Sequence, residues 1–367
     1  MKSSMGTNLI ITLFGKSHGQ LVGAVLDGLA AGIKINESFI SDQLKLRSGD
    51  ERISTARREQ DEIEFVSGVF NGYSDGGPLC VIIKNNNTIS SDYHKEILRP
   101  SSADYSAYCK YHGYQDYRGS GYFSARVTAP VVALAAIIIE LLQKKGIYIS
   151  SHIKRTMNYH DESFSNDESV LLSQIKKLNS QSMPVINEDI KEKMYQEILN
   201  AKQKQDSLGA EIETIIYNCP KGLGNPFFDN MESKLAYSLY SIPAIKAVSF
   251  GSGSDFVNMY GSQANDPFIL QQAQIKTLSN HNGGINGGIT NGMPIILSCC
   301  IKPTSSISLP QKTVDISKME EVTYSINGRH DPAIYSRASV IINSMVALTI
   351  ADMLVGNYGI NYFLEEQ

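Results

Sequence analysis

Two long apolar segments dominate the hydrophobic pattern of the chain. The first runs from Ser124 to Lys145 around the body VVALAAIIIELL, with Pro130 in its first turn and Gly146 as its stop. The second runs from Ala338 to Val355 and is nearly as apolar. Both predict helices. Because helices with so little polar surface must be buried on most sides, they also predict a core covered by other layers.

Most of the remaining regular segments have the composition and the flanking turns of strands. These segments are Leu9 to Phe14, Val22 to Leu26, Pro78 to Ile83, Ala210 to Tyr217 and Pro294 to Ile301. Phe39 to Arg47 predicts a short helix. We therefore expect an α+β fold in which buried apolar helices are sandwiched between antiparallel sheets.

Residues 158–206 differ from the rest of the chain because they are mostly polar and charged. Within them Ile190, Met194, Ile198 and Ala201 recur at near-helical spacing. This pattern predicts a peripheral helical insertion that carries no chemistry.

The lengths of the apolar runs and the cysteine content indicate where in the cell the protein is expected. The apolar run from Ala129 to Leu142 contains Glu140 and is shorter than the roughly 20 residues that span a bilayer, so no membrane helix is expected. The apolar run within Met1 to Phe14 is too short for the core of a signal peptide, which favours the cytoplasm. Five cysteines without a C-x-x-C pair indicate reduced thiols, and no metal site is expected.

Charge is distributed unevenly along the chain. A net charge of -4 and a pI near 6.0 argue against a nucleic-acid binder, which needs many clustered cations. Nine of the ten arginines nevertheless fall into two blocks: Arg47, Arg52, Arg57, Arg58, Arg99, Arg118 and Arg126, then Arg329 and Arg337. Because guanidinium groups bind carboxylates and phosphates bidentately, the blocks predict an anion site.

Four glycine-rich or charged motifs accompany these arginines. His18 lies in the loop Gly15 to Gly19, and a second glycine-rich loop, Asp116 to Arg126, leads into the first apolar helix. The third motif is Asn282 to Gly292, which Lys302 to Ser306 follow, and the fourth is Gly328 to Pro332 with Arg337 after it. Each motif alone also fits an ordinary turn.

In this order and spacing the four motifs resemble those of the chorismate synthase family. The resemblance extends from Gly15 through Ser54 to Glu59, Asp206 to Gly209 and Ser241 to Ala244, and as far as Asp352. It implies the chorismate synthase-like fold. It also implies one domain over residues 1–367, because motifs from both ends must meet in one site.

The resemblance implies a cytoplasmic homotetrameric lyase that uses reduced FMN to convert 5-enolpyruvylshikimate 3-phosphate to chorismate. His18 is then expected to protonate or bind the leaving phosphate, and Asp331 to assist proton removal through the flavin. The residues implied to bind substrate anions are Arg126, Arg337, Arg47 and Arg52. The residues implied to hold FMN are Ser124, Ala244, Gly287, Lys302, Pro303, Thr304, Ser305, Ser306 and Arg329.

The chain departs from the family pattern at several motif positions. Lys16 replaces a glutamate, and Ser102 replaces the second catalytic histidine of the family. A serine hydroxyl does not titrate near neutral pH as imidazole does. His112, at a position where glycine is usual, is a candidate to compensate. Two hypotheses therefore remain: a working chorismate synthase with a weakened proton-transfer step, or a silent paralogue that binds flavin or another anionic ligand.

Overall fold

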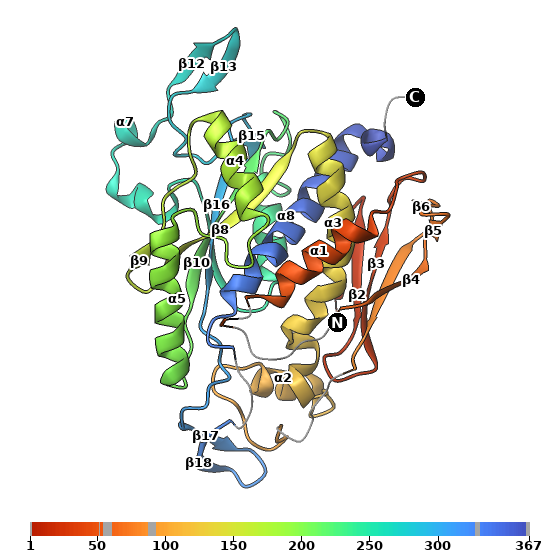
Figure 1. The fold of residues 1–367 in the computed structure, drawn as a ribbon, viewed down its shortest axis with the longest axis vertical. Coiled ribbons are helices and arrows are strands. Elements are labelled where there is room, and N and C mark those ends of the chain that lie inside the picture. Colours follow the sequence, from red (N-terminus) through yellow and green to blue (C-terminus); the bar gives the residue numbers. More distant parts are fainter. Residues whose placement is uncertain (1, 51, 54–60, 87–92, 327–330, 365–367) are drawn as a thin grey trace.

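The computed structural model describes residues 2–50, 52–53, 61–86, 93–326 and 331–364 (Figure 1). Two five-stranded antiparallel sheets form its outer layers. The first has the strand order β1 (Ser4–Met5), β2 (Ile10–Gly15), β3 (Leu21–Asp27), β7 (Leu79–Lys84) and β4 (Ile63–Ser67). The second has the order β11 (Ile245–Phe250), β16 (Ile295–Ile301), β10 (Ala210–Tyr217), β8 (Tyr148–Thr156) and β9 (Tyr159–His160).

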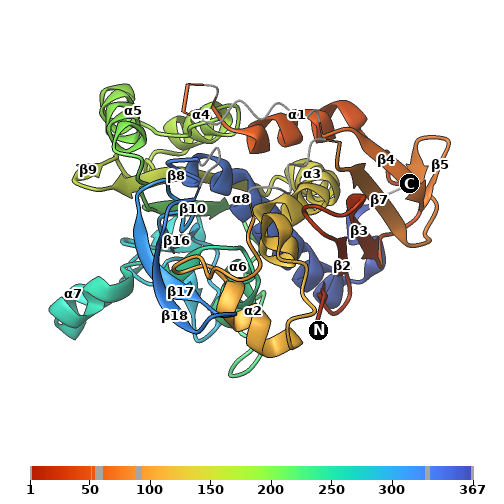
Figure 2. The ribbon, with the colours of Figure 1, turned by 90° about the horizontal axis from the view of Figure 1, so that it is seen from below.

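Three helices lie between the two sheets: α1 (Glu37–Ser48), α3 (Ala129–Lys144) and α8 (Tyr335–Tyr358). Figure 2 shows α3 and α8 enclosed between the sheets, with α3 against β3 and β7 and α8 against β8 and β10, while α1 packs on α3 and α8 at the edge of this layer. Their side chains form the centre of the main apolar core, to which both sheets also contribute. The expectation of buried helices between antiparallel sheets is confirmed.

Elements outside this sandwich are mostly short. The further helices are α2 (Asp104–Tyr111), α4 (Glu168–Leu178), α5 (Glu188–Gln203), α6 (Met231–Tyr240) and α7 (Gly261–Ala264), with short 3-10 segments at Arg118–Phe123, Ala125–Thr128, Gly253–Asn258 and Ile360–Phe363. The further strands form hairpins: β5 (Val69–Phe70) with β6 (Tyr73–Ser74), β12 (Phe268–Gln271) with β13 (Gln274–Thr277), β14 (Ile285–Asn286) with β15 (Ile289–Thr290), and β17 (Gln311–Asp315) with β18 (Glu320–Tyr324). The polar stretch 158–206 supplies α4 and α5, which contact β8 and β9.

The segment Arg118–Lys144, which ends in α3, and helix α8 are long and apolar enough to cross a membrane by length and composition. In the structure 83% and 89% of their most apolar windows are buried inside the protein. Their apolar character is therefore explained by their place in the core.

The first apolar helix begins later than its pattern predicts. Ala125–Thr128 forms a 3-10 turn, and the α-helix starts only at Ala129. Pro130 has no N–H to donate, so it must lie in the first α-helical turn, where that donor is not needed. The Ser124 hydroxyl instead caps the preceding turn by accepting a hydrogen bond from the Arg126 N–H (3.2 Å).

Asp352 fixes the beginning of the chain to the middle layer. Its carboxylate, buried on α8, accepts the backbone N–H groups of Thr7, Asn8 and Leu9 at 3.0, 2.6 and 2.9 Å. A carboxylate with three such donors is well stabilised in the interior. This contact aligns β2, and with it the turn that carries His18, against the helices.

Candidate active site

The His18 turn connects β2 to β3 and is held from outside by Asn85. Gly15 enters the turn at φ 87°, and the Asn85 side-chain amide donates to the carbonyls of Lys16 and Gly19, both at 2.9 Å. The same side chain accepts the Arg126 Nε–H through its oxygen at 3.0 Å. Asn85 thus ties the His18 turn to Arg126, a link that no motif in the sequence indicated.

The second glycine-rich loop packs directly on this turn. Gly119, Ser120 and Gly121 all have positive φ, at 55°, 65° and 51°, and the Ser17 N–H donates to the Gly121 carbonyl (3.2 Å). A Cβ at Gly119 would lie 2.1 Å from His18 Cδ2, so glycine is required there. The structure therefore brings the first two motifs into contact and buries His18, which is 8% exposed.

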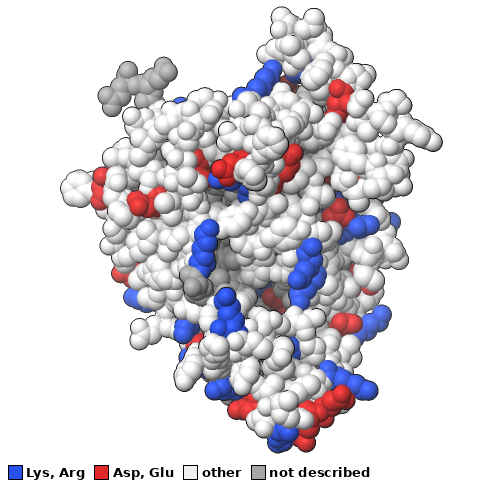
Figure 3. All heavy atoms as spheres, turned by 180° about the vertical axis from the view of Figure 1, so that it is seen from behind, with Lys and Arg blue, Asp and Glu red and all other residues white. Residues whose placement is uncertain are grey.

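A cavity of about 200 Å³ lies between the end of α1, the segment that leads into α3 and the beginning of α8. Its charged lining consists of Arg47, Asp61, Arg126, Asp331 and Arg337, and its apolar wall of Ile242, Pro243, Ile301, Ile334, Ala338 and Ile341. The face of the molecule opposite to that of Figure 1 shows Lys and Arg side chains gathered around a hollow (Figure 3). Cations next to a largely apolar wall suit a planar, negatively charged ligand.

Asp61 pairs with two of these arginines at once. One carboxylate oxygen lies 2.9 Å from an Arg47 nitrogen, and the other forms an ion pair with Arg126. Arg47 also donates to the Ala125 carbonyl (2.9 Å), and Arg126 to the Lys84 carbonyl (3.3 Å). The two guanidinium groups are therefore held in fixed orientations. Asp61 was not predicted as a site residue, because one aspartate among several acidic residues matches no functional motif.

Arg337 and Asp331 form the second charged pair of the cavity. Their closest nitrogen and oxygen are 3.2 Å apart, at the beginning of α8. The structure thus brings together four predicted residues, Arg47, Arg126, Asp331 and Arg337, from three distant parts of the sequence. Ser124 also lines this cavity.

The segment Lys302 to Ser306 begins beside the cavity, after Ile301. The Lys302 N–H donates to the carbonyl of Ala244 (3.0 Å), which has φ 75°, a conformation that costs a residue with a Cβ free energy. The Lys302 ammonium donates to the Ser101 carbonyl (2.6 Å). Burial, with a contribution from nearby Lys246, lowers the pKa of Lys302. A negatively charged ligand would stabilise the charged form of this partly buried ammonium group.

The other residues predicted to hold FMN lie in different surroundings. The Thr304 carbonyl accepts a hydrogen bond from the Ser207 hydroxyl (2.8 Å). Gly287 has φ 60°, and a Cβ placed there would meet nothing within 4 Å, so it faces open space. In the same segment Pro303 is exposed, and Ser305 and Ser306 are partly buried. Arg329 lies outside the described residues.

Arg52 lies away from the cavity lining. Its guanidinium carbon is 3.7 Å from the ring centroid of Tyr195 on α5, and its side chain is 60% exposed. It forms ion pairs with Asp50 (3.5 Å) and Glu192 (3.9 Å). In this structure Arg52 connects the loop after α1 to the polar insertion.

Ser102 and His112 both occupy structural positions at the ends of α2. The Ser102 hydroxyl donates to the Arg99 carbonyl (2.9 Å) and accepts the Asp104 N–H (3.1 Å). His112 ends the helix in a left-handed conformation, φ 53°, with its side chain exposed. Ser102 therefore stabilises the beginning of α2, and His112 forms its end.

The comparisons with known proteins agree on one family. A family model described as chorismate synthase matches residues 9–355. The chorismate synthase of Thermococcus kodakarensis is 40% identical over 353 residues, which cover 95% of this chain and 97% of that protein. The chorismate synthase of Campylobacter lari is 40% identical over 360 residues, which cover 98% and 96%.

A solved structure described as a crystal structure of chorismate synthase has the same fold. It superposes with a TM-score of 0.75 at 27% sequence identity and covers 97% of this chain and 94% of its own. Sequence and fold therefore agree over nearly the whole length, including the strands and helices that build the cavity. The chain belongs to the chorismate synthase family.

Proposed function

We propose that the cavity lined by Arg47, Arg126 and Arg337 is the active site at which the chain forms chorismate. The family gives the reaction, an anti-1,4-elimination of phosphate from 5-enolpyruvylshikimate 3-phosphate, and reduced FMN as the cofactor. In this elimination a C–H bond and the C–O bond to phosphate break, a new C=C bond forms, and a proton and phosphate leave.

The observation that carries the proposal is the pairing of the buried Asp61 carboxylate with both Arg47 and Arg126. The substrate has two carboxylates and a phosphate, and a carboxylate is already accepted at this point of the cavity. Fixed guanidinium groups offset the repulsion between substrate charges without reorganising. Arg337, beside Asp331 on the same cavity, supplies a third cation.

His18 is the group proposed to stabilise or protonate the leaving phosphate. Asn85 connects the backbone of its turn to the Arg126 guanidinium, so the turn and the guanidinium are held in one hydrogen-bonded unit. Asp331 is the carboxylate proposed to assist removal of the substrate proton. Arg337 keeps that carboxylate in place.

The residues around Lys302 fit FMN. Lys302 offers a partly buried ammonium, and Ile242, Pro243 and Ile301 supply an apolar wall for a planar ring. Ser124, Ala244, Gly287, Lys302 to Ser306 and Arg329 are the residues proposed to hold the cofactor. Bound reduced FMN supplies an electron-rich ring that lowers the barrier to breaking the C–O bond. The protein's own residues bind and orient the substrate and exclude water around it.

A variant series tests the placement of this site under anaerobic conditions with chemically reduced FMN. Arg126→Ala is expected to reduce chorismate formation by at least about 100-fold, because it removes a charge-assisted contact and leaves Asp61 facing the substrate. Arg118 is the control: it is 43% exposed and pairs with Asp116, so Arg118→Ala should remain close to the parent. Equal activity of both variants would place the substrate elsewhere.

We also propose that the chain forms one domain and assembles as a cytoplasmic homotetramer. The hairpin β12–β13 projects from the body (Figure 1) and exposes Phe268, Leu270 and Ile275 at 71%, 80% and 60%. An exposed apolar arm of this kind is typical of an interface, and a second copy of the chain is its proposed partner. Sedimentation of the parent should give a tetramer, and Leu270→Asp should shift it to smaller species.

A further inference from the structure

The His18 imidazole has an aromatic neighbour that no motif singled out. The rings of His18 and Tyr93 meet edge to face, with centroids 5.3 Å apart and planes at 85°. The backbone of Gly119 is also close to the imidazole, since a Cβ there would lie 2.3 Å from His18 Nε2. The imidazole is therefore next to both the Tyr93 ring and the second glycine-rich loop.

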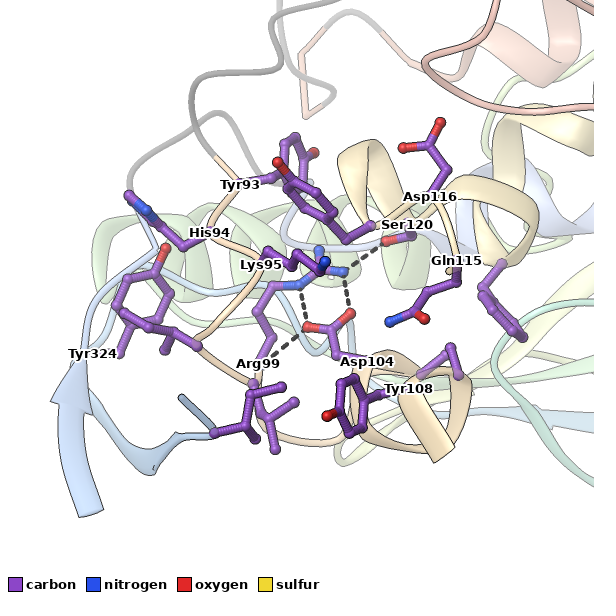
Figure 4. Close-up of a pocket in the computed structure, with 17 residues that line it drawn as sticks. Tyr93, His94, Lys95, Arg99, Asp104, Tyr108, Gln115, Asp116, Ser120 and Tyr324 are labelled. Carbon is purple, nitrogen blue, oxygen red and sulfur yellow. Dashed lines mark hydrogen bonds and ion pairs between the residues drawn. The ribbon is translucent and has the colours of Figure 1, made fainter. Parts of the chain in front are cut away.

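Arg99 holds both of these neighbours. Its guanidinium carbon lies 5.3 Å from the centroid of the Tyr93 ring, and one of its nitrogens donates to the Ser120 hydroxyl at 3.1 Å, next to Gly119. Figure 4 shows the same guanidinium bound to Asp104 through two hydrogen bonds of 2.8 and 2.7 Å. Arg99 is almost completely buried, so its orientation is fixed.

This arrangement restricts the rotation of His18. An imidazole that gives a proton to, or binds, a departing phosphate must point in one direction when the bond breaks. The Tyr93 ring covers one side of the imidazole and so limits the rotamers that His18 can adopt. The ring contact needs the aromatic face and edge of Tyr93, and it does not need the hydroxyl.

We propose that Tyr93 is a positioning residue for His18, which acts by holding the imidazole in its productive orientation through ring contact. The inference rests on the role of His18 in the proposed function. An aromatic pair shifts the equilibrium between side-chain orientations by about two- to tenfold. A general acid or base typically raises the rate of a reaction by about 10² to 10⁴-fold. Loss of the ring should therefore cost part of the His18 contribution and leave the rest of the site intact.

The test compares Tyr93→Leu and Tyr93→Phe in the whole enzyme with reduced FMN. Tyr93→Leu should lower kcat about tenfold while KM for the substrate changes less than about twofold, because the arginines that bind it are untouched. It should also move the limb of the pH profile of kcat that belongs to His18. Tyr93→Phe should restore kcat to within about threefold of the parent. Tyr114, which is 93% exposed, is the control, and Tyr114→Leu should behave as the parent.

A double-mutant cycle separates positioning from general damage to the fold. In a His18→Ala background, Tyr93→Leu should change kcat by less than about twofold, because the group that it positions is gone. A full tenfold loss in that background overturns the inference, as does a Tyr93→Phe variant as impaired as Tyr93→Leu. If His18→Ala alone leaves kcat unchanged, the proposed role of His18 fails first, and the inference fails with it.

Discussion

The carboxylate of Asp61 is paired with the guanidinium of Arg126 on the wall of the cavity, with side chains only 3% and 8% exposed. Arg47 shares the same carboxylate. Asp61 thus neutralises the two guanidinium groups to which a substrate anion is proposed to bind. The stability of the fold and the binding of anions should therefore be coupled at this residue.

Asp61→Asn tests that coupling. In phosphate-free buffer we expect the free energy of unfolding to fall by about 1–3 kcal/mol, because two guanidinium groups lose their shared carboxylate. Added inorganic phosphate should raise the Tm of this variant more than that of the parent, since an anion bound only by the folded state stabilises it. Thermal unfolding at several phosphate concentrations measures both effects. Identical phosphate responses in the two proteins would contradict the shared anion site.

Arg337→Lys tests the bidentate geometry at the beginning of α8. Lysine keeps the charge but loses the planar fork, so substrate binding should weaken about tenfold or more and FMN binding less. Arg155, which pairs with Glu211 on the second sheet at 2.9 Å and is 48% exposed, is the matched control. Calorimetry should show parent-like binding for Arg155→Lys. Parent-like binding by Arg337→Lys as well would make Arg337 a structural residue.

Much of the fold could be predicted from the hydrophobic pattern, because burial of α3 and α8 is dictated by their composition. The strand predictions coincide with β2, β3, β7, β10 and β16 to within one or two residues. The hairpins β12–β13 and β17–β18 were not predicted, since both are short and largely polar or exposed and so lack a buried face.

Candidate site residues could be predicted from the sequence where one residue type carries the chemistry. They were missed where their role depends on contacts between distant segments. Arginines cluster visibly along the sequence, so Arg47, Arg126 and Arg337 were predicted, and the structure places all three on one cavity. Asn85 and Asp61 contact Arg126 from 41 and 65 residues away, and the contact of Tyr93 with His18 likewise joins two segments, so no local pattern indicated them. The stacking of Arg52 on Tyr195 of α5 could not be foreseen for the same reason.

Ser102→His should raise the rate of elimination while it slightly destabilises α2. A histidine restores a group that titrates near neutral pH, and such assistance is typically worth about 10² to 10⁴-fold, so partial recovery is measurable. Loss of the hydrogen bond from the Asp104 N–H to the Ser102 hydroxyl should cost about 1 kcal/mol. Single-turnover rates and thermal unfolding give the two numbers. An unchanged rate would show that another group already supplies the proton.

The buried His152 should make stability depend on pH. Burial opposes its charge, but hydrogen bonds to Asp161 (2.7 Å) and Glu213 (3.0 Å) outweigh burial and raise the pKa of His152. A raised pKa stabilises the fold fully below the unfolded value of about 6.5, and this stabilisation is lost as pH rises through the folded value. The same contacts lower the pKa values of Asp161 and Glu213 despite burial, so their contribution is lost in acid.

His152→Gln measures this contribution. Its destabilisation relative to the parent should be largest near pH 6 and should shrink toward pH 9, as the parent loses the stability that the charged imidazole gave. Urea denaturation at several pH values gives the difference. A difference that stays constant from pH 6 to pH 9 would mean that His152 is neutral in the folded protein.

FMN and substrate should bind cooperatively. They are proposed to bind next to each other in one site, so each one orders side chains that lie beside the other. Anaerobic titration should show tighter flavin binding in the presence of 5-enolpyruvylshikimate 3-phosphate. The absence of any flavin spectral change, with or without substrate, would refute the residues assigned to the cofactor.

Turnover by the purified parent protein tests the central claim most directly. The protein is incubated anaerobically with chemically reduced FMN and 5-enolpyruvylshikimate 3-phosphate, and chorismate and inorganic phosphate are measured together over time. We predict that both accumulate in equal amounts, over many turnovers per chain, with the flavin still reduced at the end. Flavin binding without release of either product would contradict the account and identify the chain as a silent paralogue.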